Sequence, residues 1–224
     1  GVVPLSASFD TAGPFARDPS VLERAGRVLL RETGEPPRPG KLLWPEDAFG
    51  HAEAATIAAL KPVADKLAKL LGAPRKMRVC EGSLDEWAQD FRTLMAREAW
   101  QAHAKWIETD KPNFAPDVAT RFRIASRVTD DEVAQAAPRR EAVTRHMQQL
   151  LAGNAILVMP TAPGPAPLKV TPAEALEQAR YHAHALCCIS GLARLPQLTI
   201  PAGLVDGAPV GLSLVATQIG RAHV

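Results

Sequence analysis

The sequence predicts an α/β fold in which helices pack on a partly buried β-sheet. Segments of strand character alternate with segments of helical periodicity along the 224 residues, and this alternation is typical of the α/β class. The segment NAILVMP, residues 154–160, is a short apolar run between glycine and proline and is typical of a buried strand. With 46% hydrophobic residues, the chain can bury a core as one domain or as two small ones.

The helical segments carry recognisable start and stop signals. Asp18 is placed to cap a first helix that has Pro19 at its first position. A second, amphipathic helix is predicted over residues 52–72, ended by Gly72 and kinked or divided at Pro62. Three further helices are predicted to open with capping boxes at residues 83–86, 129–132 and 171–174.

The remaining strands are predicted from short apolar or β-branched runs. Residues 41–44 and 76–80 are strand candidates in the first half of the chain. Two more runs lie near the end, around the turn signal Asp206-Gly207. Because Pro201 and Pro209 flank this signal, the connection is expected to be longer than a tight hairpin.

Charge and cysteine content exclude several classes of partner. The formal net charge is +2, without a long run of one sign, so neither nucleic acid nor an anionic membrane is an expected partner. No apolar run approaches the ~20 residues of a membrane helix. Three cysteines, of which Cys187 and Cys188 are neighbours, favour a reducing, cytoplasmic location over a disulfide framework. No metal site is predicted, since His182 and His184 diverge on a helix.

Three stretches carry a family resemblance when they are taken in order. They are GVVPLSASFDTAGPFARDP, NAILVMPTAPGPAP and ISGLARLPQLTIPAGLVDGAPVGLSLVA, at residues 1–19, 154–167 and 189–216. Together they resemble the later part of an amidase signature hydrolase. Residues 97–122 further resemble the branch of indole-acetamide hydrolases and small bacterial amidases.

The resemblance implies a mixed β-sheet covered by helices within a single domain. Residues 1–218 are interpreted as the C-terminal part of a single amidase domain. Residues 219–224, IGRAHV, match the conceptual translation of a common sequencing adapter. They are therefore interpreted as a non-native tail.

The same resemblance implies a chemistry whose catalytic groups lie elsewhere. Family members cleave amides with a Ser–Ser–Lys triad, in which lysine acts through a bridging serine on the nucleophilic serine. The motif S-x-D-T-x-G-P-x-A-R follows the glycine- and serine-rich catalytic segment, so the triad is expected upstream of residue 1. No catalytic residue is assigned in this chain, and Ser6 and Ser8 are not candidates.

The expected reaction is hydrolysis of a small carboxamide to a carboxylic acid and ammonia, without metal or organic cofactor. The expected partners are this amide and the N-terminal half of the same domain, and homodimerisation of the parent stays open. Two alternatives remain: the A subunit of a tRNA-dependent glutamine amidotransferase, and a non-catalytic module of the same fold. The motif SFDTAGPFARDP and the Trp-rich middle segment favour the small amidase.

Three residues are candidates for substrate binding. Trp100 and His103 recur with Trp106 at a spacing of three along a helix, and they could line a pocket for an aromatic amide. A core-facing stripe is the commoner role of this pattern. Thr161 follows the strand of residues 154–160, where loops of α/β folds bind ligands, although a rigid connector is equally compatible.

Two further features concern local backbone structure. Asp10, Thr11 and Arg17 belong to the best-matched motif, and a structural turn is favoured over a place on the active-site floor. Arg194 stands where the family pattern usually has glycine. The sequence leaves open whether this substitution alters a tight turn or weakens function.

Overall fold

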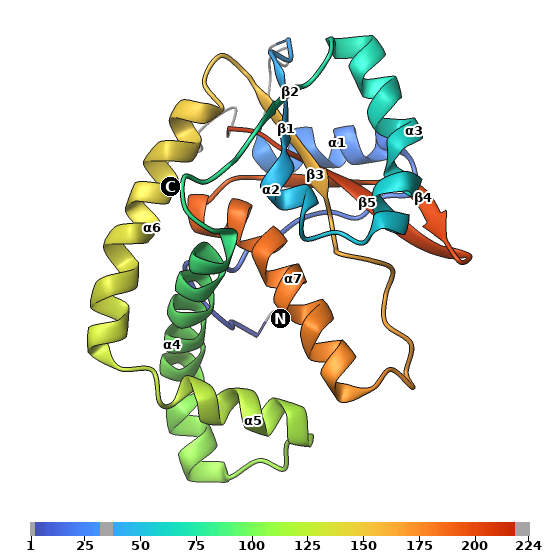
Figure 1. Cartoon of the computed structure of the whole chain (residues 1–224). Helices are drawn as coiled ribbons and strands as arrows, with labels where there is room; N and C mark the ends of the chain where they lie inside the picture. The colour runs from blue at the N-terminus through green and yellow to red at the C-terminus, as the bar shows by residue number, and fades with distance from the viewer. Residues whose placement is uncertain (1–2, 32–37, 218–224) are drawn as a thin grey trace.

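The computed structural model describes residues 3–31 and 38–217, and the predicted tail of residues 219–224 lies outside them. The described part contains seven helices and five strands (Figure 1). In chain order they are α1 Pro19–Leu30, β1 Leu42–Pro45, α2 Glu46–Phe49, α3 Ala54–Leu71, β2 Arg75–Met77, α4 Leu84–Asp110, α5 Pro116–Ala125, α6 Asp130–Leu150, β3 Ile156–Pro160, α7 Ala173–Ala193, β4 Gln197–Val205 and β5 Ala208–Val215. The predicted α/β class is confirmed.

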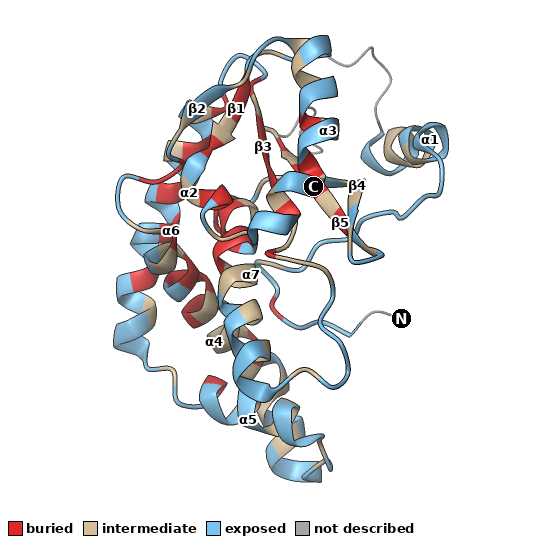
Figure 2. Cartoon of the chain, turned by 45° about the vertical axis from the view of Figure 1, so that its right-hand side comes forward, coloured by how far each residue is buried: buried red, intermediate tan, exposed pale blue. Residues whose placement is uncertain are grey.

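The five strands form one mixed sheet in the order β2-β1-β3-β5-β4. β1 pairs in parallel with β2 and β3, whereas β5 runs antiparallel to β3 and β4. Alternate side chains of β3 face opposite sides. Leu157 and Met159 join the core beneath α4, α6 and α7, and Val158 joins a smaller core beneath α3. The sheet is therefore the middle of three layers, with buried residues concentrated along it (Figure 2).

Helix starts follow the predicted caps in most cases. Asp18 accepts a hydrogen bond from Ser20 N at the start of α1, and Thr129 with Glu132 forms the full capping box of α6. Ser83 caps α4 through Asp85 N, one residue short of the capping-box bond. The box predicted at residues 171–174 is wrong, because a proline occupies the cap position and no side chain caps α7.

Proline did not divide the second predicted helix. α3 continues through Pro62, with Leu60 and Ala64 buried on either side of it, so packing on the sheet outweighs the lost hydrogen bond. Among the described residues, no helix is long and apolar enough to span a bilayer.

Two strand predictions need correction. β2 ends at Met77 rather than at residue 80, because the backbone N–H groups of Val79 and Cys80 donate to the Asp47 carboxylate instead of to a neighbouring strand. The connection between β4 and β5 is the tight two-residue turn, with Asp206 and Gly207 both at positive φ. Pro201 is accommodated because β4 is the outer strand of the described sheet and carries a register shift after residue 201. Pro209 lies near the start of β5, before residues 212–215 that pair with β3.

Some apolar surface has no partner within the described chain. α1 has no buried residue, and Val28, Leu29 and Leu30 on it are exposed (Figure 2). On the outer strand β4, Leu198 and Leu204 are also exposed. These two elements therefore present apolar surface that no other part of the described chain covers.

The three cysteines are free thiols. Cys80 and Cys188 are buried, and burial raises the pKa of the Cys80 thiol to about 12. Cys187 is exposed, because α7 turns that position away from the core.

Candidate functional site

His103 lies in an aromatic cluster near the end of α4. Its ring packs edge-to-face against Trp106 and Phe122, and Phe114 stacks on Phe122. Its Nε2 donates to the carbonyl of Pro4 at 2.7 Å. Trp100 is half-buried one turn earlier, outside the ring contacts of the described residues.

Thr161 lies directly after β3, in a different part of the fold. Its hydroxyl is 2.7 Å from that of Ser213, which also accepts from Gln197 Nε2 at 2.8 Å. The Gln197 carbonyl in turn accepts from Ser190 of α7. This polar chain ties three strands to α7. Figure 1 shows the sheet at the opposite end of the molecule from α5 and the end of α4, so Thr161 is not brought together with Trp100 and His103. Their binding role stays a prediction.

Two concave surfaces among the described residues are large enough to hold a small ligand. The larger is a cavity of about 930 Å³ between α4, α5 and α7, to which Leu5 of the N-terminal segment also contributes. We call it the α4–α5–α7 cavity. Neither Trp100 nor His103 lines it; its aromatic groups are Phe122, Tyr181 and His184.

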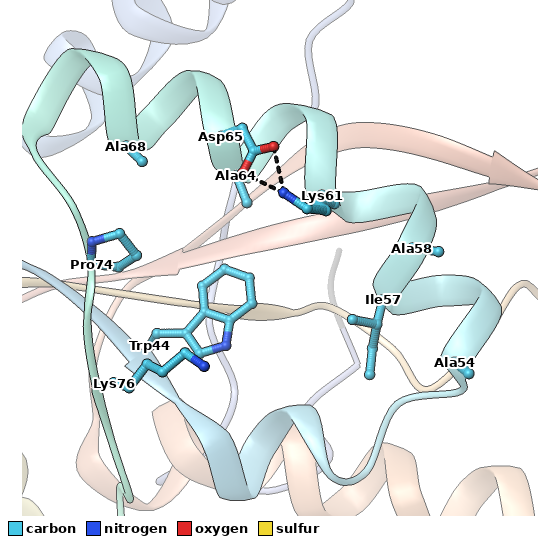
Figure 3. A pocket seen from close by; sticks show the side chains of 10 residues that line it. All are labelled: Trp44, Ala54, Ile57, Ala58, Lys61, Ala64, Asp65, Ala68, Pro74 and Lys76. Atoms are coloured by element: carbon cyan, nitrogen blue, oxygen red, sulfur yellow. Dashed lines mark hydrogen bonds and ion pairs between the residues drawn. The ribbon is translucent and has the colours of Figure 1, made fainter.

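The smaller surface is a groove of about 600 Å³ between α3 and the strands β1 and β2 (Figure 3). The Trp44 indole stacks on Phe49 with ring centres 3.8 Å apart and forms one wall. On the opposite wall, Lys61 and Asp65 form an ion pair at 2.7 Å. The third charged residue of the lining, Lys76, pairs with Glu46 outside the groove at 3.6 Å. Each charged group of the groove is therefore engaged in an ion pair.

A buried arginine, which the sequence analysis did not identify, holds the N-terminal motif. Arg140 of α6 is 4% exposed and donates to the Ser8 carbonyl at 2.8 Å and to that of Leu192 at 3.3 Å. It also donates to the Ser8 hydroxyl. Its guanidinium lies 3.8 Å from the centre of the Phe9 ring. Arg140 therefore joins the N-terminal segment to α6 and to the end of α7.

Glu98 of α4 binds the same N-terminal segment as Arg140, and we call these two residues together the clamp. Its carboxylate accepts from Ser6 Oγ at 2.9 Å, from Ser8 N at 2.8 Å and from Ser8 Oγ. Burial acts to raise the pKa of Glu98, but the hydrogen bonds from Ser8 and Ser6 and the charge of Arg140 outweigh it, and the pKa lies below its usual value. Both serines are thus engaged by an ionised carboxylate. Nearby, Asp10 accepts from the N–H groups of Leu5 and Ser6, the contact of a structural turn.

Two histidines meet outside these surfaces. The Nδ1 atoms of His51 and His182 are 3.0 Å apart. Burial lowers the pKa of His51, opposed by the charge of Asp85 and reinforced by that of His182. His184 faces the α4–α5–α7 cavity instead, as the divergence of the two histidines on α7 predicted. No cluster of metal-ligating residues occurs in residues 3–31 and 38–217.

The backbone at Arg194 explains why glycine is usual there. Arg194 ends α7 with φ 54° and ψ 41°, the left-handed conformation that favours glycine after a helix. Its side chain reaches back to α6 and donates to Glu141 Oε1 at 2.7 Å and to Thr144 Oγ1 at 3.0 Å. The turn is therefore kept, and the arginine adds contacts that glycine lacks.

We expect Arg194→Ala to destabilise the protein more than Arg194→Gly, by about 1 kcal/mol. Both variants lose the contacts to α6, but only alanine retains the cost of the left-handed backbone, ~1 kcal/mol relative to glycine. Urea unfolding of the two variants measures the difference. Equal stabilities would contradict the assignment of strain to this position.

Comparison with known proteins decides the family. The family model for Amidase matches residues 73–222, which is most of the chain. The chain belongs to the amidase signature family. The resemblance stated from the three sequence stretches is thereby confirmed.

Individual relatives extend beyond the matched segment. Amidase 1 of Arabidopsis thaliana is 29% identical over 246 aligned residues, covering 96% of this chain and 58% of that protein. Translocon at the outer membrane of chloroplasts 64 of Pisum sativum is 27% identical and covers 98% of this chain and 42% of that protein. The glutamyl-tRNA(Gln) amidotransferase A subunit of Neisseria meningitidis is another relative, at 25% identity. The chain spans about half the length of these relatives.

A solved structure shows the same fold. The crystal structure of an amidase superposes with a TM-score of 0.81 and 24% sequence identity, over 96% of this chain and 50% of that chain. This agreement confirms the mixed sheet covered by helices as an amidase signature fold.

Proposed function

We propose that this chain is part of an amidase that hydrolyses a small carboxamide to a carboxylic acid and ammonia. The observation that carries the proposal is the match of residues 73–222 to the amidase family. An alignment to a plant amidase over 96% of the chain supports it. The remaining half of the relatives' length is where the triad is expected.

The proposed reaction passes through an acyl-serine. The serine oxygen attacks the amide carbon while its proton passes through the bridging serine to lysine. The C–N bond then breaks, the nitrogen takes a proton and leaves as ammonia, and water hydrolyses the ester. In this scheme the present residues contribute support: Glu98 and Arg140 fix Ser6 and Ser8, in the motif that follows the catalytic segment in the family. The apolar surfaces of α1 and β4 would contact the rest of the domain.

The test is ammonia release from phenylacetamide and indole-3-acetamide by the protein in its full natural length. We expect turnover by the full-length protein, and none when the nucleophilic serine of the triad is replaced by alanine. A polypeptide of residues 1–224 alone is expected to release no ammonia, because none of its positions matches the triad. Absence of turnover by the full-length protein on any simple amide would overturn the proposal.

Experiments on the same full-length protein distinguish this function from two alternative functions. The amidotransferase relative makes glutamine a second candidate substrate, and ammonia release from glutamine that a partner subunit stimulates would favour that function. The translocon relative makes a non-catalytic role the other candidate. A full-length sequence without the two serines and the lysine would favour it.

A further inference from the structure

The α4–α5–α7 cavity has walls suited to an apolar ligand body. Met95 and Ala99 of α4 and Phe122 and Ala125 of α5 form much of its lining. Its volume of about 930 Å³ is within the usual size of small-molecule sites. Figure 1 shows α5 beside the lower part of α4 and below α7.

Three arginines interrupt these apolar walls. Arg180 is engaged in an ion pair with Glu177. Arg92 donates only to a neutral acceptor, Gln89 Oε1 at 2.7 Å, and lies 6.0 Å from the Tyr181 ring centre. Arg121 has no hydrogen-bond or ion-pair partner among residues 3–31 and 38–217. Two guanidinium groups at the cavity therefore lack a carboxylate partner.

The remaining charges of the lining do not neutralise this pair. The acidic lining residues are Asp117 and Glu177. Glu177 is held by Arg180, and Asp117 forms no ion pair with Arg121 in the described chain. Burial lowers the pKa of His184 on the same wall, and the charges of Arg92 and Arg121 lower it further. The positive charges of Arg92 and Arg121 therefore both act on this wall of the cavity.

We propose that the α4–α5–α7 cavity binds amide substrates whose apolar body ends in a carboxylate, which is bound by Arg92 and Arg121. The planar guanidinium matches a carboxylate bidentately, and the partly apolar surroundings strengthen that contact. Leu5 also lines the cavity, so a ligand bound there lies beside the N-terminal segment. This inference rests on the proposed function for the reaction, because the catalytic segment precedes that segment in the family.

The test compares two amides of similar shape on the full-length protein. 4-Carboxyphenylacetamide carries the carboxylate, and 4-acetylphenylacetamide is its neutral counterpart. We expect kcat/KM to favour the carboxylate about tenfold. Arg121→Gln should remove most of this preference by raising KM for the carboxylate alone. Arg123→Gln, an exposed α5 arginine outside the cavity lining, is the matched control and should leave the preference unchanged.

Equal kcat/KM for the two amides, or an equal loss for both in Arg121→Gln, overturns the inference. If the protein turns over no amide, the proposed function fails and the cavity is tested by calorimetry with the same two amides, 4-carboxyphenylacetamide and 4-acetylphenylacetamide, of which only the first carries a carboxylate. Tighter binding of the first compound, lost in Arg121→Gln and kept in Arg123→Gln, supports the carboxylate site independently of hydrolysis. Equal affinities overturn it.

Discussion

Replacing Arg140 with methionine is expected to lower the free energy of unfolding by about 3–5 kcal/mol. Arg140 is 4% exposed, and its removal leaves the carbonyls of Ser8 and Leu192 without their charged donor. It also removes the positive charge that helps to hold Glu98 ionised. Methionine retains the apolar part of the arginine side chain. The decrease in the free energy of unfolding therefore measures the contribution of the polar contacts. Urea unfolding of the full-length protein measures it.

Arg145→Met provides the matched control for this substitution. Arg145 lies on the same helix but is exposed, and we expect a change within about 0.5 kcal/mol. Arg140→Lys should fall between the two, because an ammonium group cannot reproduce the forked donor geometry. A loss below about 1 kcal/mol in Arg140→Met, or equal losses at both arginines, would show that the clamp does not stabilise the fold.

The position of Arg140 along its helix predicts that the residue is buried, although an arginine is not expected in a core from its residue type alone. Arg140 lies four residues after Ala136 and three before Val143, both buried on α6, so a charged residue occupies the apolar face of its helix. Arg139 beside it is more than half exposed. Helical periodicity could therefore select which of the two arginines is buried. It could not supply the partner, because Ser8 is 132 residues away.

Features of the fold that depend on residues close together in the sequence were predicted well. Features that depend on contacts between distant residues were not. Asp18 and Thr129 cap their helices as the sequence indicates, because each cap forms within three residues. The end of β2 was missed because the Asp47 carboxylate, 32 residues away, takes the N–H of Val79. The left-handed backbone of Arg194 was indicated by the glycine usual there, but not its contacts with α6.

The substrate-binding candidates illustrate the same limit. A spacing of three correctly grouped His103 with Trp106, whose rings are in contact. Which aromatic groups line the cavity depends on the crossing of α4, α5 and α7, and the lining came from Phe122, Tyr181 and His184. A single sequence does not encode those crossing angles in any local pattern.

Gly203→Val is the second substitution with a large expected effect, a loss of about 2–3 kcal/mol in the free energy of unfolding. A Cβ at Gly203 would lie 2.5 Å from the Ala59 carbonyl oxygen of α3 and 3.0 Å from its Cβ. Backbone atoms cannot move aside as a flexible side chain can. The substitution therefore has to separate α3 from β4 at the register shift that follows Pro201.

Strand propensity alone predicts the opposite effect on stability, because valine is a better strand residue than glycine. If close packing were unimportant, Gly203→Val would stabilise β4. Gly13→Val is the control, since a Cβ at Gly13 has nothing within 4 Å, and a change within about 0.5 kcal/mol is expected. A neutral or stabilising Gly203→Val in urea unfolding would mean that α3 does not contact β4 as closely as the structure shows. A selective loss would locate the tightest helix–sheet contact of this layer at Gly203.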